Sequence, residues 1–508
     1  MASDGIHMPP STRDLALASN ERWTNMAERI QFELHRLTDY LWEIPKTGPM
    51  KVPGRIFADD NLMEAIKSDD CLAQVANVAC MPGIVRYSFA MPDIHLGYGF
   101  PIGGVAAFDP EDGGVISPGG VGYDINCGVR VARTNLMLKD IEPKLEGLLK
   151  ALFHAIPCGV GEQQHVIEVA AKELPEVLKK GSRWALEHGY ATEEDVQCTE
   201  EGGCLAGADP KSVSDRAFKR GVNQVGTLGS GNHFLELQVV SEIYDQTAAN
   251  AFGLTKDQVC CMIHCGSRGL GHQVCTDHLK VLEGATRRYQ IKLPDRQLAC
   301  APISSPEGRA YFGAMAASAN YAWANRQLIT HTTRQILKKM FSIDDKEMPL
   351  VYDVAHNVAK IEEHLVDGRK VKVCVHRKGA TRSFGPHTAD IPDKLSSVGQ
   401  PVIIPGSMGT PSFVLRGTSK AMERTFGSTC HGAGRVMSRT QAKKKFSGKE
   451  VMAVLARQGI FVKAPNEAAI ADEAPDVYKS SQEVVRVVHE VGLSLLVARL
   501  QPLGGIKG

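Results

Sequence analysis

The spacing of apolar residues alternates between helical and strand-like along the chain, which predicts a mixed α and β protein. Residues 305–342 carry alanine and aromatic side chains at helical spacing, and we interpret their apolar face as core rather than as a cofactor site. Helical spacing also occurs in 61–79, in 140–200 and in the tail after about 448. Glycine-bounded, β-branched runs predict strands within 52–60, 99–109, 113–134, 232–240, 260–264, 349–355, 371–376 and 401–404.

The sequence shows no clear domain boundary. From residue 41 to 508 there is no Ser- or Pro-rich linker and no internal repeat. Residues 1–25 are polar and contain acidic residues, unlike a signal or transit peptide. We interpret residues 1–40 as an N-terminal extension, either flexible or added during cloning, with Met26 as an alternative start.

Composition places the chain among globular proteins. Of its 508 residues 43% are hydrophobic and 23% charged, and no apolar run approaches the roughly 18 residues of a membrane helix. The 58 Lys and Arg nearly balance the 57 Asp and Glu, which excludes a uniformly basic surface but allows a local basic groove. The 13 cysteines are odd in number and unevenly spaced, as expected of reduced thiols. We therefore predict a cytoplasmic protein, nuclear as well in a eukaryote, with no membrane partner.

The segment GGVGYDINCGVR holds the first candidate metal ligands, Asp124 and Cys127. Glycines on both sides allow close approach of the backbone, and a carboxylate and a thiolate three residues apart can converge on one ion. The alternative is a turn aspartate followed by a small buried cysteine.

Three histidines stand where strand-like runs meet polar residues: His233 in LGSGNHFLE, His264 in MIHCGSRGLG and His356 in VYDVAHNVAK. A single histidine in such a place is usually structural. With three of them, a metal site and a structural role are about equally supported. Together with the Asp and Cys they would suffice for a two-metal site that shares the thiolate.

A fourth candidate is His431, in the Gly/Ala loop GSTCHGAGR, with Arg435 four residues later. If a helix begins here, its free amides and the arginine would suit a phosphate. His431 could then act as a nucleophile at phosphorus. A glycine-rich turn with a solvent-facing histidine is an equal alternative.

The absence of common motifs narrows the function. The sequence has no GxxxxGK[ST] loop, no Lys-x-Asp-Gly ligase motif and no HExxH, so any nucleotide is held in an unusual way. Basic clusters at 211–220, 376–382 and 435–445 could line a phosphate groove or be solvated faces. Only 31 residues are aromatic, and the sequence does not reveal a base-stacking platform.

Taken together, the motifs resemble the RtcB family of RNA-splicing ligases over residues 41–508. The matching segments are GGVGYDINCGVR, LGSGNHFLE, GSRGLGHQV, DVAHN, HRKGATR, PGSMGT, STCHGAGR and the final Lys507-Gly508. The resemblance implies one compact α+β catalytic domain, with sheets flanked by helices around a central metal cleft. It also implies a GTP- and Mn²⁺-dependent ligase that joins an RNA 3′-phosphate or 2′,3′-cyclic phosphate to a 5′-hydroxyl, with archease as an activating partner.

The resemblance also implies roles for individual residues. Asp124, Cys127 and His233 would hold one Mn²⁺, while Cys127, His264 and His356 would hold a second, and His431 would carry GMP. Nucleotide contacts would come from Asn232, Phe234, Glu236, Asn357, Ser407, Ser412, Gly432, Gly434, Arg435, Tyr478 and Lys507. Arg220 would lie near RNA or phosphate. Asp93, in MPDIHLGYGF, is interpreted as a carboxylate behind the ligands or a general base.

Two other functions use the same residues. One is a metal-dependent phosphoesterase with His431 as general acid, and the other is an RNA-binding subunit without turnover. The metal is also open on chemical grounds, because a thiolate and three imidazoles suit zinc better than manganese. Mn²⁺ is implied by the family alone.

Overall fold

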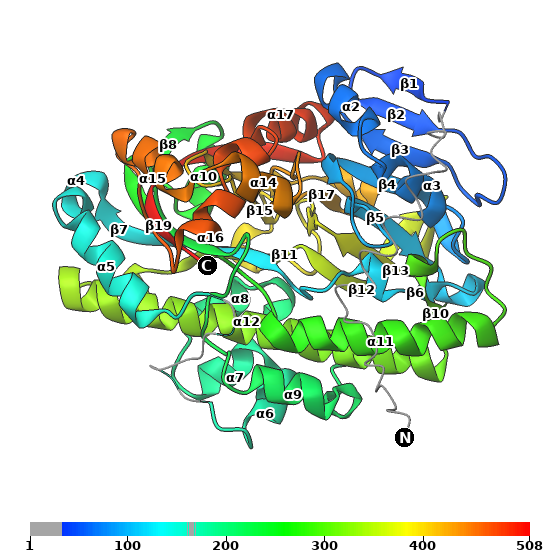
Figure 1. Cartoon of the computed structure of the whole chain (residues 1–508), viewed down its shortest axis with the longest axis horizontal. Coiled ribbons are helices and arrows are strands. Elements are labelled where there is room, and N and C mark those ends of the chain that lie inside the picture. Colours follow the sequence, from blue (N-terminus) through cyan, green and yellow to red (C-terminus); the bar gives the residue numbers. More distant parts are fainter. Residues whose placement is uncertain (1–32, 160, 162–166, 168) are drawn as a thin grey trace, which may run out of the picture.

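Two large β-sheets organise the chain in the computed structural model, which describes residues 33–159, 161, 167 and 169–508. The first sheet has seven strands in the order β1-β2-β3-β4-β5-β13-β12. Their bounds are β1 (His35–Thr38), β2 (Leu41–Ile44), β3 (Gly54–Phe57), β4 (Ile84–His95), β5 (Ile102–Phe108), β13 (Arg369–Lys378) and β12 (Asn357–Val366). This sheet includes the N-terminal part of the described chain (Figure 1).

The second sheet has eight strands and contains the middle and the end of the chain. Seven follow the order β11-β7-β9-β8-β19-β16-β15, and β18 pairs with β19 beside this path. Their bounds are β11 (Leu350–Ala355), β7 (Gly128–Met137), β9 (Gln258–Cys265), β8 (Phe234–Ile243), β19 (Ser494–Lys507), β16 (Ser412–Gly417), β15 (Pro401–Ile404) and β18 (Phe461–Lys463). Two small sheets pair β10 (Ala301–Pro302) with β6 (Val115–Ile116), and β14 (Ala380–Arg382) with β17 (Ser428–Cys430).

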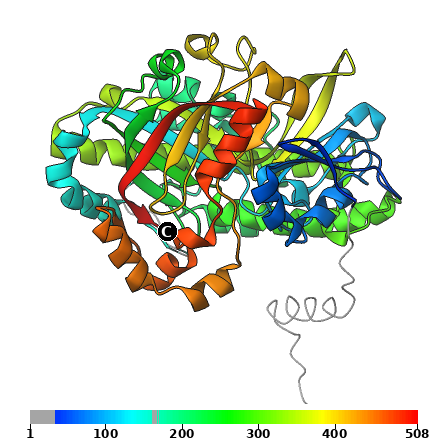
Figure 2. The ribbon, with the colours of Figure 1, turned by 90° about the horizontal axis from the view of Figure 1, so that it is seen from above.

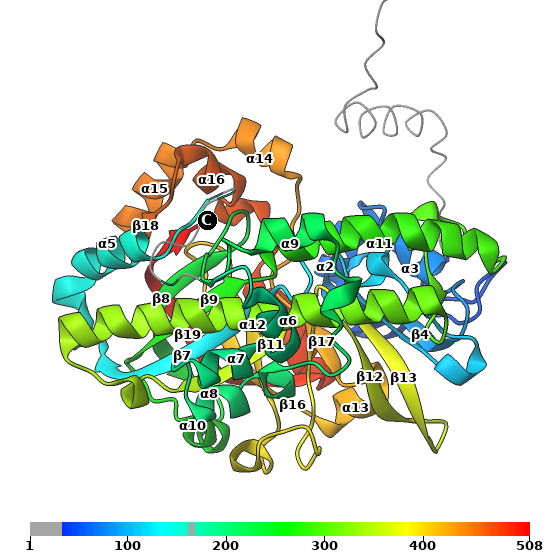
Figure 3. The same ribbon diagram turned by 90° about the horizontal axis from the view of Figure 1, so that it is seen from below.

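Two long helices, α11 (Arg268–Arg288) and α12 (Pro306–Phe341), run side by side across one face of the molecule (Figures 1 and 3). The α12 helix begins where the Ser305 hydroxyl accepts a hydrogen bond from the Gly308 amide at 3.0 Å. It packs against β9, whose eight residues are all buried. The predicted helix over 305–342 is therefore confirmed, together with the core role of its apolar face.

The remaining helices are short and cover the faces and ends of the sheets. They are α2 (Asp60–Lys67), α3 (Cys71–Val78), α4 (Leu138–Ile141), α5 (Leu145–Ala155), α6 (Leu174–Lys180), α7 (Ser182–Glu187), α8 (Glu193–Gln197), α9 (Asp215–Gly221), α10 (Gln246–Phe252), α13 (Ser419–Thr425), α14 (Arg439–Lys445), α15 (Gly448–Arg457), α16 (Glu467–Asp472) and α17 (Ser481–Val491). The α17 helix packs against β19 of one sheet and β4 of the other (Figure 2). The two sheets thus belong to one compact α+β domain, as predicted. None of these helices is long and apolar enough to cross a membrane.

The strand segments predicted from the sequence do not include β1, β2, β4, β10, β12, β14, β16, β17, β18 and β19. Two of these, β12 and β19, show why. The β12 strand reads KIEEH in its centre and forms a hairpin with β13. Its Lys360 and Glu362 side chains are buried in ion pairs with Glu200 and Arg377, and Glu363 is exposed. The β19 strand contains Pro502 and two glycines, which usually mark loops. The fold accepts them because β19 is irregular against β8 at Arg499/Leu500 and again at Pro502/Gly504.

The expected boundary between residues 1–40 and 41–508 falls between β1 and β2. These two strands pair as an antiparallel hairpin, with Arg36 opposite Trp42. The sheet therefore begins a few residues before position 41. Residues 1–32, including Met26, lie outside the described part of the chain.

Candidate active site

Four of the five predicted metal ligands come together because of strand direction. The β7 and β8 strands begin where their antiparallel neighbours β9 and β11 end. Gly128, the first residue of β7, pairs with the last residue of β9 and with the last residue of β11. Residues just before or at these ends therefore share one edge of the sheet: Cys127, His233, His264 and His356.

The tightest group of metal-type donors is Asp124, Cys127 and His233, whose ligand atoms all lie within 4.8 Å of one another. His233 Nε2 is 2.8 Å from Asp124 Oδ2 and 3.6 Å from Cys127 Sγ. The other ring nitrogen, Nδ1, lies 3.0 Å from the Leu228 carbonyl, which turns Nε2 toward the group. A carboxylate, a thiolate and an imidazole in this arrangement can hold a divalent cation.

A second, more open set shares the same sulfur atom. His264 Nε2 lies 3.2 Å from Cys127 Sγ. His356 Nδ1 is 2.9 Å from the Thr381 hydroxyl, and its Nε2 is buried without a hydrogen-bond partner among the described residues. Because a buried nitrogen without a partner is costly, an ion at this position would satisfy it. The donors therefore fit the metal that the family implies, and also softer ions.

Burial sets the protonation of these ligands before any ion binds. Burial, and then the neighbouring His356, lower the pKa of His264 well below its usual value, so its imidazole is neutral. Burial and the adjacent Asp124 raise the pKa of the Cys127 thiol to about 11. A cation that binds here must therefore displace the thiol proton.

His431 follows β17, and its partner is Asp93 near the end of β4. The Asp93 side chain is fully buried, and its Oδ2 accepts hydrogen bonds from His431 Nδ1 at 2.6 Å, from the His431 amide at 2.9 Å and from the Gly432 amide at 3.2 Å. Burial acts to raise the pKa of Asp93, but the interactions with His431 outweigh it and lower the pKa. The carboxylate is therefore charged, and the lone pair of His431 lies on Nε2.

No helix begins at His431 in the described chain, so the condition for a phosphate site at free helix amides is not met. The next helix, α14, begins at Arg439 with Ser438 as its cap. The amides of His431 and Gly432 donate to Asp93, so they are not free to bind a phosphate. The sequence suggested that Asp93 is a carboxylate behind the metal ligands or a general base. In the structure its carboxylate contacts His431.

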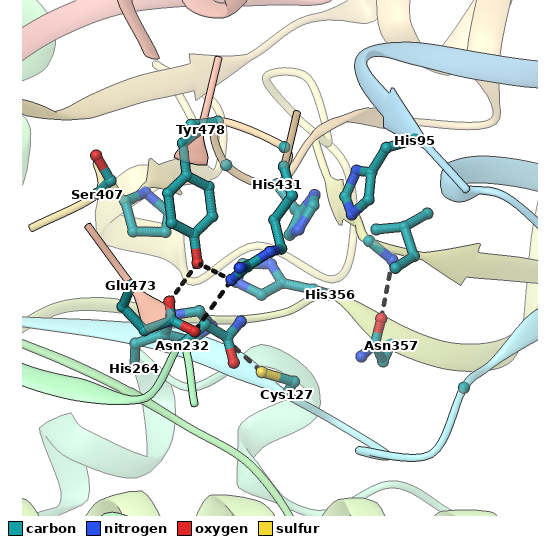
Figure 4. A pocket seen from close by; sticks show the side chains of 18 of the residues that line it. His95, Cys127, Asn232, His264, His356, Asn357, Ser407, His431, Glu473 and Tyr478 are labelled. Atoms are coloured by element: carbon teal, nitrogen blue, oxygen red, sulfur yellow. Dashed lines mark hydrogen bonds and ion pairs between the residues drawn. The ribbon is translucent and has the colours of Figure 1, made fainter. Parts of the chain in front are cut away.

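A pocket of about 340 Å³ opens beside these groups (Figure 4). The rings of His431 and His356 are 5.3 Å apart at its wall, and Cys127 and His264 also line it. Nine of the eleven predicted nucleotide contacts line the same pocket: Asn232, Phe234, Asn357, Ser407, Gly432, Gly434, Arg435, Tyr478 and Lys507.

The other two predicted nucleotide contacts, Glu236 and Ser412, lie behind the pocket wall. The Ser412 hydroxyl accepts hydrogen bonds from the Gly406 amide and from Gln238 Nε2, both at 2.9 Å. Gln238 Nε2 also donates to Glu236 at 2.8 Å. Burial raises the pKa of Glu236 to about 7. Neither side chain is therefore among those that line the pocket.

The pocket also contains residues that the sequence did not single out. Glu473 is buried, and its Oε1 accepts a hydrogen bond at 3.1 Å from Arg435 Nη1, which lies 3.2 Å from the Tyr478 hydroxyl. Nothing in the alanine-rich stretch around Glu473 indicates this role. Lys378 lies within the motif HRKGATR and could have been found there. Its Nζ donates to the Phe100 carbonyl at 3.0 Å, and burial lowers its pKa to about 7.

A second, more open hollow of about 500 Å³ lies on the other side of the Asp124 group. We call it the basic groove, and its charged walls are Lys219, Arg220, Arg268 and Arg439. Asp124 and His233 line this groove, whereas Cys127 lines the pocket. Arg220, expected near RNA or phosphate, is oriented by a 3.1 Å hydrogen bond to Gln273. The metal-type donors thus lie between the two hollows.

Comparison with known proteins gives consistent matches over most of the chain. Residues 74–508 match the family model described as tRNA-splicing ligase RtcB. The chain is 57% identical over 479 residues to the tRNA-splicing ligase RtcB of Archaeoglobus fulgidus, covering 94% of this chain and 99% of that protein. For the corresponding protein of Thermococcus kodakarensis the identity is 53% over 478 residues, with the same coverage. The RNA-splicing ligase RtcB of Mycobacterium tuberculosis is 52% identical over 436 residues, or 86% of this chain and 100% of that protein.

These matches and the site agree on an RNA ligase of mixed α/β fold with a metal-type centre beside a histidine–aspartate pair. The chain belongs to the RtcB family.

Proposed function

We propose that residues 41–508 form a GTP- and Mn²⁺-dependent ligase that joins RNA 3′-phosphate or 2′,3′-cyclic phosphate ends to 5′-hydroxyl ends. The observation that carries the proposal is the His431–Asp93 pair, which leaves a free imidazole nitrogen beside a pocket lined by the expected nucleotide contacts. The substrates would be tRNA halves or broken RNA with such ends. The thirteen cysteines form no disulfide among the described residues, which supports a reducing compartment such as the cytoplasm.

The first step of the proposed reaction transfers GMP to His431. The Nε2 lone pair attacks the α-phosphorus of GTP, a P–N bond forms, and the bond to the bridging β-phosphate oxygen breaks to release pyrophosphate. Asp93 accepts a hydrogen bond from the Nδ1–H group of His431 and stabilises the positive charge that the ring gains. Arg435 and Lys507 line the pocket and offset phosphate charge.

The next two steps use the RNA ends. A 3′-phosphate oxygen attacks the phosphorus of the histidine adduct, the P–N bond breaks, and an RNA(3′)pp(5′)G end forms. The 5′-hydroxyl oxygen of the second RNA then attacks the 3′-phosphorus, GMP leaves, and the hydroxyl proton passes to solvent. A cyclic phosphate is first opened by water to the 3′-monophosphate. GMP activation is needed because an unactivated 3′-phosphate would have to expel oxide.

The metal centre would serve the same steps. One ion would be held by Asp124, Cys127 and His233, and the other by Cys127, His264 and His356. A divalent cation bound by these residues would spread the negative charge of the phosphates and help to orient the reacting oxygens. The shared thiolate also suits zinc, so manganese is supported by the family rather than by the donors.

A covalent adduct separates this proposal from a phosphoesterase and from a binding subunit. We expect the purified chain to gain the mass of GMP after incubation with GTP and MnCl₂, but not with ATP. The His431→Ala variant should gain nothing, because it lacks the nucleophilic nitrogen. The measurement is intact-protein mass spectrometry.

The matched control is His154→Ala, an exposed histidine on α5, which should form the adduct as the parent does. An adduct that persists in His431→Ala would overturn the nucleophile. If the metal-loaded parent forms no adduct, the phosphoesterase is favoured.

A further inference from the structure

Three aromatic rings connect the nucleotide pocket with the basic groove. The rings of Tyr98 and Tyr123 meet edge to face, with centroids 5.7 Å apart and planes at 66°. The Tyr123 ring stacks on His272 at 4.9 Å with the planes at 29°. Tyr98 and Tyr123 line the pocket, while Tyr123 and His272 line the groove. We call these three residues the aromatic row.

The position of the row beside the candidate chemistry is fixed by its elements. Tyr123 directly precedes Asp124 in the chain, and both residues line the basic groove together with His233. His272 lies in the second turn of α11 and is exposed, and both tyrosines are half-buried. Because His272 is exposed and lines the basic groove, another planar group that enters the groove can reach its ring.

The basic groove supplies the complementary charge. Lys219, Arg220 and Arg268 line the same hollow as Tyr123 and His272. A cationic groove that follows the phosphates, combined with aromatic rings that stack on bases, is the common design of single-strand nucleic-acid sites. The low aromatic content of the sequence hid this platform, because it needs only three rings, which come from three separate segments of the chain.

We propose that the aromatic row is a stacking platform for the unpaired base next to an RNA end, with the adjoining phosphates lying along the basic groove. This deepens the proposed function and rests on it, since it takes the RNA end as the substrate. The base is recognised by its planar face rather than by its edges, so the platform accepts any sequence. It holds the RNA end beside the Asp124 group while leaving the pocket open for the nucleotide.

The test uses RNA that carries the fluorescent base 2-aminopurine at its 3′-phosphate end or at its 5′-hydroxyl end. Stacking quenches this base, so titration with the full chain and MnCl₂ reports both contact and affinity. We expect quenching at one of the two ends in the parent. His272→Ala and Tyr123→Leu should lose the quenching and weaken binding by about tenfold.

His272→Phe and Tyr123→Phe are the matched controls, because they keep a planar ring and should behave as the parent does. RNA without a base at the contacted end should bind the parent and the ring-less variants equally. Loss of binding that is the same for the Phe and the ring-less variants, or that persists with base-less RNA, would overturn the platform. Unquenched 2-aminopurine at both ends in the parent would also overturn it.

Failure of the platform and failure of the ligase proposal give different results. The mass measurement with GTP contains no RNA, so a chain without an adduct can still quench 2-aminopurine. A chain that forms the adduct but leaves both RNA ends unquenched keeps the ligase chemistry and loses the platform.

Discussion

The orientation of the His431 imidazole depends on a residue 338 positions earlier in the chain. Asp93 Oδ2 accepts hydrogen bonds from the ring N–H and from the backbone amide of His431. One oxygen atom therefore holds both the imidazole and the loop that carries it. Because this carboxylate is buried and charged, it favours the tautomer with the lone pair on Nε2. A histidine held in this way needs no separate base to act on phosphorus.

Asp93→Asn should slow adduct formation by about 100-fold or more, because the amide is neutral and also permits the wrong tautomer. The KM for GTP and the content of bound metal should stay near those of the parent. The check is the single-turnover rate of GMP transfer, with Asp70→Asn, an exposed aspartate, as the control. A parent-like rate in Asp93→Asn would show that Asp93 is not needed to orient or activate His431.

At the scale of single residues, the sequence located the metal-type donors and left their partners unknown. Asp124 and Cys127 share a glycine-rich segment, and each histidine stands where an apolar run meets polar residues. This pattern supported a metal site and structural roles about equally, and the family resemblance then assigned the ligands. The contact between Asp93 and His431, and the role of Glu473, depend on segments that meet only in the folded chain. No local periodicity carries that information.

One side chain of α12 connects the core to the site. The guanidinium of Arg326 is fully buried and makes a two-pronged ion pair with Asp353 at 2.8 and 2.9 Å. It also donates to the carbonyls of Asn126 at 2.8 Å and Cys265 at 2.7 Å. These carbonyls adjoin Cys127 and His264 in the chain, so the helix fixes the backbone on both sides of the shared sulfur.

Arg326→Met should therefore lower the free energy of unfolding by about 3–5 kcal/mol, because it leaves buried carbonyls and part of a carboxylate without a donor. Bound metal per chain should fall as well. Urea denaturation and metal analysis provide the measurements. Arg309→Met, at an exposed position of the same helix, should change the unfolding free energy by less than about 0.5 kcal/mol. Equal stability of the two variants would contradict this account.

At the scale of elements, helices were easier to predict than strands. The α12 pattern repeats over ten turns, so its bounds followed from spacing alone. The β12 and β19 strands are defined by pairing with distant partners, which compensates for charged residues in one and for Pro502 in the other. Sheet order was beyond the sequence for the same reason.

Across the whole molecule, buried ion pairs join segments that lie far apart in the chain. Glu201 accepts hydrogen bonds from Lys360 of β12 at 2.9 Å and from Arg382 of β14 at 2.8 Å. Lys360, and to a lesser extent Arg382, lower the pKa of the Glu201 carboxyl, whereas burial raises it. The two cations outweigh burial, and the pKa falls from 4.5 to about 2. The folded state therefore holds Glu201 charged at a pH where the unfolded chain would protonate it.

This shift predicts acid sensitivity with a definite sign. The folded pKa is depressed, so the stabilisation is complete above about pH 5 and is lost as the pH falls toward 2. Glu201→Gln should lower the unfolding free energy by roughly 2–3 kcal/mol at pH 7, and the difference from the parent should shrink in acid. Urea denaturation at pH 7, 5 and 3 measures it, with Glu64→Gln, an exposed glutamate on α2, as the control. A difference that does not change with pH would contradict the linkage.

The position of β19 between β8 and β16 has a consequence for how the chain is made. The β19 strand, which pairs with one edge of β8, is synthesised roughly 250 residues after β8. At ordinary rates of synthesis this delay is about 12–50 s. Throughout that interval a growing chain displays an unpaired, apolar strand edge that another nascent chain could join. A chaperone that covers the β8 edge during synthesis should therefore raise the yield of folded protein, because it prevents pairing between nascent chains.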